Sequence, residues 1–231
     1  MRLAHSGETG PLWVCAQRQT DGRGRSGRNW VSKQGNLFAS LLIRLPGPIE
    51  NLGQLSLVAG IAVADAIGSA LDAQNAQTKA GGLWLKWPND IMFGSAKCGG
   101  LLVETSTSQR VKELNVVIGV GLNLAHDANL DDRATTCLSD HGLDISPPEM
   151  LAFLDQAMLL RLREWDRGNG FSSIRTSWLA SAGDVGRPIS VHEGANVIKG
   201  MFEGLSPHGH LLVRLDEGKV RKVAWGDVMF P

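Results

Sequence analysis

One apolar segment constrains the fold more than any other part of this chain. Residues Gln54 to Leu71 (QLSLVAGIAVADAIGSAL) carry apolar side chains at three- and four-residue spacing and are rich in alanine. The spacing predicts a helix, and the scarcity of polar side chains predicts that it is largely buried. Two apolar runs with strand character precede it, Leu12 to Gln17 and Asn36 to Leu45. A buried helix next to such strands indicates a packed layer of sheet and helix.

More strands follow the apolar segment. Leu83 to Phe93 and Cys98 to Thr105 are predicted to be strands, and the turn residues Gly94-Ser95-Ala96 between them indicate a hairpin. Leu114 to Leu124 predicts a further, β-branched strand, and Pro147 to Trp165 a helix that begins at two prolines. The expected fold class is α+β, a mixed sheet with helices on one side.

The C-terminal part of the chain has a different pattern of apolar and turn residues. Four short strands with glycine-containing turns between them are predicted at Pro188 to His192, Val197 to Leu205, Leu211 to Leu215 and Val220 to Ala224. This pattern indicates a small β-barrel or sandwich, which is too small to be stable without packing on a larger domain. We therefore predict two domains, residues 1–182 and residues 183–231.

Composition excludes several classes of protein. The 231 residues are 43% hydrophobic, and 23 Lys and Arg balance 23 Asp and Glu. A net charge of zero argues against general binding to nucleic acid or to anionic membranes. No apolar stretch was expected to reach the length of a membrane span, and the first residues lack the apolar core of a secretory signal. The three cysteines form no CxxC pair, so no disulfide framework or zinc site is indicated. We expect a soluble, cytoplasmic protein.

The segment Asp21 to Arg28 (DGRGRSGR) is the most unusual one in the chain. Its glycines let the backbone approach a ligand closely, and its arginines offer planar donor groups to phosphate or carboxylate. A solvated loop or an RGG-like nucleic-acid contact would have the same composition. The segment lacks the GK[ST] of a P-loop, which disfavours a nucleotide site of that type.

Three further motifs combine charge with turn residues or glycines. In Lys86-Trp87-Pro88-Asn89-Asp90, the proline favours an extended Trp87, so Lys86 can end a strand. This motif is consistent with a plain turn at the end of a strand. It is equally consistent with a site that binds an anion, Mg²⁺ or a ligand hydroxyl group. KCGGLLVE (97–104) and GVGLN (119–123) place glycines in strands, where either a ligand or close strand packing can use the space.

Taken in order, QTDGRGRSGRNW, KWPNDI, KCGGLLVE and GVGLNL resemble the catalytic core of the biotin protein ligases. The resemblance runs from about Gly10 to Leu124 and continues more weakly at AWGDV (224–228). It implies a mixed sheet with flanking helices, like that of class II synthetases, followed by an SH3-like barrel. It also implies the activity of a biotin–[biotin carboxyl carrier protein] ligase. Such an enzyme uses ATP to form biotinyl-5′-AMP with Mg²⁺, then transfers biotin to a lysine of the carrier.

The same resemblance assigns the site residues, one by one. Lys97, Arg25, Arg28 and Asp90 match catalytic positions, with Lys97 between the biotin carboxylate and the α-phosphate. Positions that match the biotin site are Gln19, Gly22, Arg23, Arg25, Trp30, Lys97, Gly100, Leu102, Gly119 and Gly121. Positions that match the ATP side are Arg25, Arg28, Lys86, Asn89, Lys97 and Asn123. No protein-made metal site is expected, and His208 and His210 lack further ligands nearby.

Two departures from the family pattern bear on these expectations. The Ser-Thr-Asn segment that contacts the biotin ureido group does not occur, and Met1 to Ala4 resemble the latter half of the helix that follows it. The ligase domain is thus expected to lack its first strand and part of its first helix. A winged-helix segment is also not seen, which indicates a monofunctional ligase, monomeric or homodimeric. The alternatives are a lipoate or octanoate ligase or transferase of the same fold, an RNA-binding module, and an inactive, truncated product.

Overall fold

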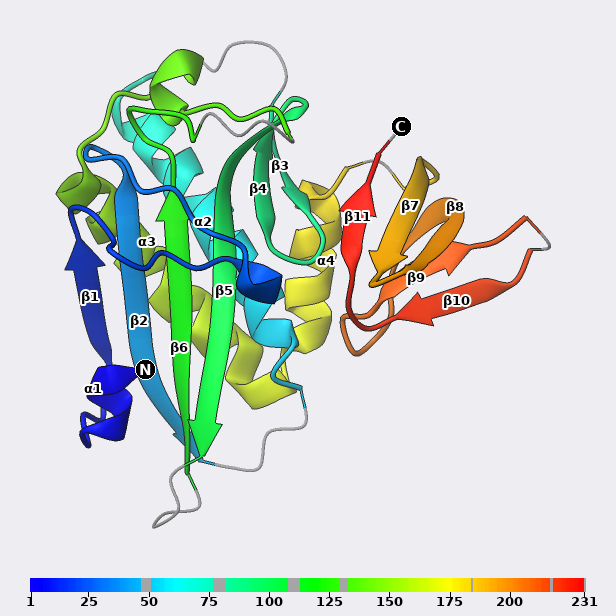
Figure 1. The fold of residues 1–231 in the computed structure, drawn as a ribbon, viewed down its shortest axis with the longest axis horizontal. Helices are drawn as coiled ribbons and strands as arrows, with labels where there is room; N and C mark the ends of the chain where they lie inside the picture. The colour runs from blue at the N-terminus through cyan, green and yellow to red at the C-terminus, as the bar shows by residue number, and fades with distance from the viewer. Residues whose placement is uncertain are drawn as a thin grey trace.

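Two antiparallel sheets organise the computed structural model (Figure 1). The first sheet has the order β1-β2-β6-β5-β4-β3, and the second has the order β10-β9-β8-β7-β11. The strands of the first sheet are β1 (Leu12–Ala16), β2 (Leu37–Pro46), β3 (Leu83–Lys86), β4 (Asp90–Phe93), β5 (Ala96–Thr107) and β6 (Glu113–Leu122). The structure describes residues 1–46, 51–76, 82–107, 113–128, 133–183, 185–216 and 218–230.

Helices cover one face of the first sheet (Figure 1). They are α2 (Gln54–Ala73), α3 (Pro147–Trp165) and α4 (Phe171–Ser181), and all three lie behind the sheet in the view. On the opposite face lies the short α1 (Arg2–His5), where Ala4 packs against Leu42 and Val117. The expected α+β architecture with helices on one side is confirmed. Within the described residues, parallel pairing occurs only at two isolated bridges, Leu85 with Ala182 and Lys97 with Thr135.

Helix α2 is the centre of the core. Most of its side chains are buried, because the sheet covers one side and α3 and α4 cover the other. Its 20 residues and its mean hydropathy of 1.6 would suit a membrane span, so the expectation that no segment reaches this length was wrong. Two thirds of that apolar window is buried in the protein, as in the core helix of a globular domain.

The predicted elements are largely present, with one strand divided. Residues 83–93 form two strands, β3 and β4, which pair antiparallel with Lys86 opposite Asp90. The Trp87-Pro88-Asn89 segment is the tight turn between them, because proline cannot continue the ladder. The hairpin at Gly94-Ser95, which joins β4 to β5, is confirmed. Helix α3 begins as predicted, with a capping box between Ser146 and Glu149.

Five short strands form the second sheet. They are β7 (Pro188–Glu193), β8 (Asn196–Leu205), β9 (Leu211–Arg214), β10 (Val220–Val223) and β11 (Asp227–Met229). Each pairing is antiparallel, and no pairing between β10 and β11 closes the sheet within the part of the chain that is described. The SH3-like barrel therefore stays a prediction. The buried side chains of this sheet belong to the same core cluster as those of α2 and the first sheet.

Candidate active site

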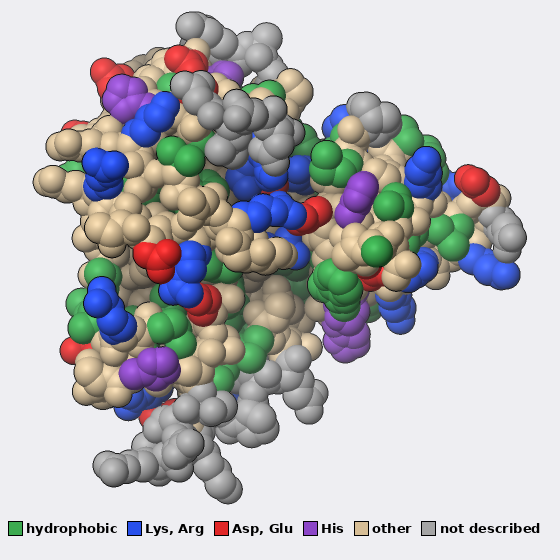
Figure 2. Space-filling view, viewed as in Figure 1, with side chains coloured by type: hydrophobic (Ala, Val, Ile, Leu, Met, Phe, Trp, Pro, Cys, Tyr) green, Lys and Arg blue, Asp and Glu red, His purple; other side chains and the backbone are tan. Residues whose placement is uncertain are grey.

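A cavity of about 1360 Å³ lies on the face of the first sheet that the long helices leave open. Strands β2, β5 and β6 form its floor, the loop 18–30 crosses over it, and residues 225–229 of the second sheet close one side. Figure 2 shows Lys and Arg side chains gathered beside an acidic side chain in the hollow between the two sheets. The cavity thus combines an apolar floor with a cationic rim.

The structure brings together nearly all of the residues that the motifs single out. The predicted site residues that line this one cavity are Gln19, Arg23, Arg25, Arg28, Trp30, Lys86, Asn89, Asp90, Lys97, Gly100, Leu102, Gly119 and Gly121. Gly22 and Asn123 do not line it. The Gly22 carbonyl accepts a hydrogen bond from the Trp30 amide at 2.9 Å. Asn123 is buried after β6, and its Oδ1 has no hydrogen-bond partner among the residues that the structure describes.

Two lysines converge on one carboxylate at the rim of the cavity. The β4–β5 hairpin brings Lys97 Nζ into close contact with Asp90, and Lys86 Nζ lies 3.3 Å from the other carboxylate oxygen. Burial raises the pKa of Asp90, but the two lysines outweigh it and hold that pKa below its usual value. Burial lowers the pKa of Lys97, and the Asp90 charge opposes this only in part. Across the hairpin Asp90 pairs with Gly100 and Lys97 with Met92, so the hairpin brings two residues that are seven positions apart into contact.

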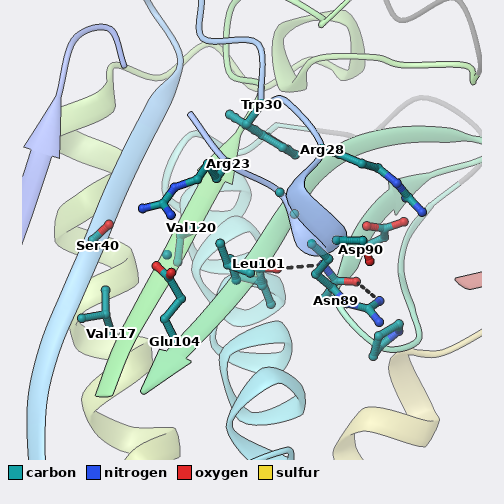
Figure 3. A pocket seen from close by; sticks show the side chains of 18 of the residues that line it. Arg23, Arg28, Trp30, Ser40, Asn89, Asp90, Leu101, Glu104, Val117 and Val120 are labelled. Atoms are coloured by element: carbon teal, nitrogen blue, oxygen red, sulfur yellow. Dashed lines mark hydrogen bonds between the residues drawn. The ribbon is translucent and has the colours of Figure 1, made fainter. Parts of the chain in front are cut away.

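Arg25 is held by groups from two distant parts of the chain. One Nη donates to Asn89 Oδ1 at 3.1 Å, and both Nη atoms reach the Gly226 carbonyl at 3.3 and 3.2 Å. Asn89 in turn donates to the Leu101 carbonyl at 2.7 Å, which fixes the turn over the sheet (Figure 3). Asp227 contacts Arg28 closely and lies 3.6 Å from Arg25. The second sheet thus supplies part of the site.

Trp30 lies on the glycine floor. A Cβ added to Gly121 would be 2.6 Å from two atoms of the Trp30 ring, and one added to Gly100 would be 3.1 Å from it. The Lys97 ammonium stands 5.4 Å from the centre of this ring, which is cation–π distance. The glycines therefore admit an indole ring. The open floor lies further along β5 and β6, at Leu102, Gly119 and Glu104.

Several residues of the cavity were not expected. Ser40 and Glu104 line it from β2 and β5, and Gly226 and Asp227 line it from the second sheet. Glu104 lies two residues after Leu102 on β5, and Ser40 lies opposite Gly119 on the neighbouring β2. Because alternate residues of a strand share one face, strand alternation could have indicated both. Asp227 belongs to the motif AWGDV (224–228), but the motif gives it no role, because its contacts with Arg25 and Arg28 join residues about two hundred positions apart.

Other reactive side chains offer less. Cys98 is buried, and burial raises the pKa of its thiol far above the ordinary range, so a thiolate nucleophile is not available there. Within the described ranges, no group of three or more His, Cys, Asp or Glu could hold a metal ion.

Fold and site define a class: a protein whose sheet carries helices on one face and, on the other, a cavity with a glycine-rich floor and a cationic rim. The chain belongs to the Biotin/lipoate A/B protein ligase family, whose model matches residues 2–123, and a "Biotin protein ligase C terminal domain" matches residues 184–230.

Relatives and solved structures agree with this membership. A biotin–[acetyl-CoA-carboxylase] ligase of Paracoccus denitrificans is 37% identical over 92% of this chain and 88% of its own length. The bifunctional ligase/repressor BirA of Bacillus subtilis is 30% identical over 98% of this chain and 68% of its own. The structure of biotin protein ligase from Aquifex aeolicus, in complex with biotin and ATP, has a TM-score of 0.81 and 27% identity. It covers 100% of this chain and 93% of that one.

Proposed function

We propose that this protein is an ATP-dependent biotin ligase. It activates biotin as biotinyl-5′-AMP and transfers it to a lysine of a biotin carboxyl carrier protein or domain. The single observation that carries the proposal is the convergence of Arg25, Arg28, Lys86 and Lys97 on one cavity with a glycine-rich floor. The relatives named above support it. Residues 1–182 would form the ligase domain, and residues 183–231 a second domain that completes the site.

In the first step, a biotin carboxylate oxygen attacks the α-phosphorus of ATP, and the bond to pyrophosphate breaks. Two anions must meet, which costs on the order of 4 kcal/mol at about 4 Å and an effective dielectric near 20. Lys97 offsets this repulsion, because it stands between the glycine floor and the arginines. Arg25 and Arg28 would bind the phosphates through their free N–H groups. These fixed cations act most strongly where charge develops in the transition state.

Mg²⁺ fits this site as a companion of ATP. Asp90 is engaged by Lys86 and Lys97, so it is not a free ligand. We therefore propose that Mg²⁺ is held mainly by the phosphates, where it would neutralise charge on the leaving pyrophosphate. Asn89 completes the ATP side from the rim of the cavity, whereas Asn123 is buried behind it and donates to the Thr136 carbonyl at 3.0 Å, so its assignment to the ATP side rests on the family resemblance alone.

In the second step, the amine of the carrier lysine attacks the acyl carbon, and AMP leaves. The pKa of Asp90 is held low by two lysines, so this carboxylate is a weak proton acceptor. We assign Asp90 to holding Lys97 in place and to attracting the incoming ammonium group. On the biotin side, Gln19 and Arg23 would contact the ureido end, and Gly22, which does not line the cavity, would act through its carbonyl, which holds the Trp30 amide. Trp30, Gly100, Leu102, Gly119 and Gly121 would enclose the ring and the chain.

Glu104 supports biotin over a lipoyl substrate. Its side chain lines the cavity on β5, one row beyond Leu102 and Gly119, and it has no ion pair or side-chain hydrogen bond with any of the residues that the structure describes (Figure 3). A carboxylate at this position can accept the two N–H groups of a cyclic urea in charge-assisted hydrogen bonds. A dithiolane ring offers it no donor. Adenylation assays with biotin and with lipoate, run side by side, separate the two substrates.

The RNA-binding hypothesis fits the structure less well. It requires arginines that project to solvent. Arg23 and Arg28 are partly exposed, but Arg25 is mostly buried and lines the cavity, and both Arg25 and Arg28 contact Asp227. We propose a cytoplasmic enzyme, monomeric or homodimeric, that acts on a protein carrier without nucleic acid or a membrane.

The test of the proposal is biotin-dependent exchange of labelled pyrophosphate into ATP. We expect exchange well above the control without biotin when this chain is incubated with ATP and Mg²⁺. Absence of exchange by a folded protein, judged by its unfolding transition, would contradict the proposal. Exchange with lipoate but not with biotin would replace it with the lipoate alternative.

A further inference from the structure

The second sheet holds the arginine loop through two consecutive residues, Gly226 and Asp227. Asp227 is the first residue of β11, and it is paired with His192 of β7. Its carboxylate contacts Arg28 and lies 3.6 Å from Arg25, while the Gly226 carbonyl accepts from both Nη atoms of Arg25. Within the described residues, every hydrogen bond and ion pair between the two arginines and the second sheet is made with this pair.

The arrangement solves an electrostatic problem of the loop. Arg25 and Arg28 lie within one short turn, η1 (Arg25–Gly27) and its C-cap, so their charges repel each other. A carboxylate that contacts both guanidinium groups offsets this repulsion before any substrate arrives. Like charges held close together in an empty site would otherwise favour an open loop.

The contacts leave the arginines able to bind a phosphate. A guanidinium group carries five N–H donors, and the Nε of Arg25 makes no hydrogen bond within the described protein. Arg28 contacts Asp227 through Nη2 alone. The second sheet therefore orients both side chains without using all of their donors.

We propose that Asp227 is a positioning residue, which acts through Arg25 and Arg28 to keep the loop closed over the adenylate. This inference rests on the proposed ligase function. We call the contacts of Gly226 and Asp227 with Arg25 and Arg28 the latch. In this role the latch controls how long biotinyl-5′-AMP stays in the site before the carrier arrives. A competing role, in which Asp227 occupies the phosphate position and blocks ATP, predicts the opposite effect of its removal.

The test compares Asp227→Asn with Asp216→Asn and with Asp227→Glu. Asp216 is an exposed carboxylate near the β9–β10 turn, and its side chain makes no hydrogen bond or ion pair with the described part of the chain, so its variant is a matched control. We expect biotinyl-5′-AMP to dissociate about ten-fold faster from Asp227→Asn, the effect of losing one charge-assisted hydrogen bond. The KM for ATP should rise, the KM for biotin should change little, and Asp227→Glu should restore part of the retention.

A second measurement is independent of catalysis. Hydrogen exchange of the ligand-free protein reports loop closure directly, because the Gly24 and Trp30 amides are hydrogen-bonded within the loop. Exchange at residues 22–30 should be faster in Asp227→Asn and unchanged in Asp216→Asn.

Unchanged exchange and unchanged adenylate release would overturn the latch, and a lower KM for ATP would assign Asp227 the blocking role. Failure of the ligase proposal would appear separately, as a wild-type chain that lacks biotin-dependent pyrophosphate exchange.

Discussion

At the scale of single residues, the site is organised around a buried ion pair. Lys97 and Asp90 are both mostly removed from water, and such a pair contributes little net stability because desolvation offsets the attraction. The ion pair serves to position Lys97, because Asp90 holds its ammonium group beside the Trp30 ring and the glycine floor. A cation fixed in this way costs no reorganisation when two anions meet next to it.

Replacing Lys97 with alanine should abolish adenylate formation while leaving the fold intact. The loss of one fixed cation at the reacting centre predicts a fall of about 10³-fold in pyrophosphate exchange. Lys222→Ala, an exposed lysine of β10, is the control and should exchange at the wild-type rate. Near-normal exchange by a folded Lys97→Ala variant would remove Lys97 from this role.

The pH dependence of adenylation should reveal the protonation of Lys97. Burial lowers its pKa, so the alkaline limb of kcat/KM for biotin should lie below the ordinary lysine range. Asp90 favours the charged form of Lys97, while Lys86 and Arg133 disfavour it. In Asp90→Asn the pKa of Lys97 therefore falls further, and the alkaline limb should move to lower pH. A limb that stays in place would mean that another group limits the rate.

Arg25→Ala should let biotinyl-5′-AMP escape from the site. Arg25 ties the loop to both Asn89 and Gly226, so its removal frees the loop from the turn and from the second sheet. The measurement is the amount of adenylate that stays with the protein through gel filtration, with Arg221→Ala as the control. Retention equal to that of the wild type would contradict loop closure by Arg25.

At the scale of elements, glycines decide where rings can lie on the sheet. Gly100 and Gly121 face each other across β5 and β6, and the Trp30 ring packs directly on them. The motifs left two uses open for the space beside these glycines, a bound ligand or close strand packing. Only the three-dimensional path of the loop identifies Trp30 as the group that lies there.

Gly121→Ala tests this packing. The new methyl group would stand 2.6–2.8 Å from atoms of the Trp30 ring, so the indole must shift into the cavity. We expect biotin affinity to fall about ten-fold, as measured by calorimetry, because the shifted ring takes space from the ligand. If biotin affinity is unchanged while the protein stays folded, the indole does not border the biotin site.

Sequence patterns predicted elements in proportion to how much apolar surface each one buries. Strong periodicity identified α2, α3 and the long strands. Helix α4 was missed, because its only buried residues are Phe171, Ile174 and Trp178 in a serine-rich segment, and β11 was missed because it has three residues. The motifs identified the first-sheet side of the site. Contacts between distant segments, such as Arg28 with Asp227, leave no local pattern in a sequence.

At the scale of the whole molecule, the two sheets share one core. The β8–β9 turn reaches across to the first sheet, where the Gly209 carbonyl accepts a hydrogen bond from Trp87 Nε1 of the β3–β4 turn at 3.3 Å. Buried side chains of both sheets form one continuous cluster. We therefore expect the chain to unfold in a single cooperative transition in calorimetry. Two separate transitions would show that the sheets are independent units.

Gly209→Ala should weaken that junction. A Cβ there would stand 3.0 Å from Leu57 and 3.1 Å from Phe171, at a positive φ of 86°. Gly218→Ala is the matched control, since its φ is also positive, at 76°, but a Cβ there meets nothing within 4 Å. We expect Gly209→Ala to lower the free energy of unfolding by about 1–3 kcal/mol more than Gly218→Ala. If the two variants lose the same free energy of unfolding, backbone strain alone explains the effect of Gly209→Ala.

The place of α2 at the centre of the core has a consequence for how the protein is made. The helix leaves the ribosome before β5, β6, α3 and α4, which together cover it in the finished molecule. At roughly 5–20 residues per second, about a hundred further residues take on the order of 5–20 s to synthesise. During that interval the growing chain exposes an apolar segment as long as a membrane span. The yield of folded protein in a cell should therefore depend on chaperones that bind this apolar segment until α4 has been synthesised.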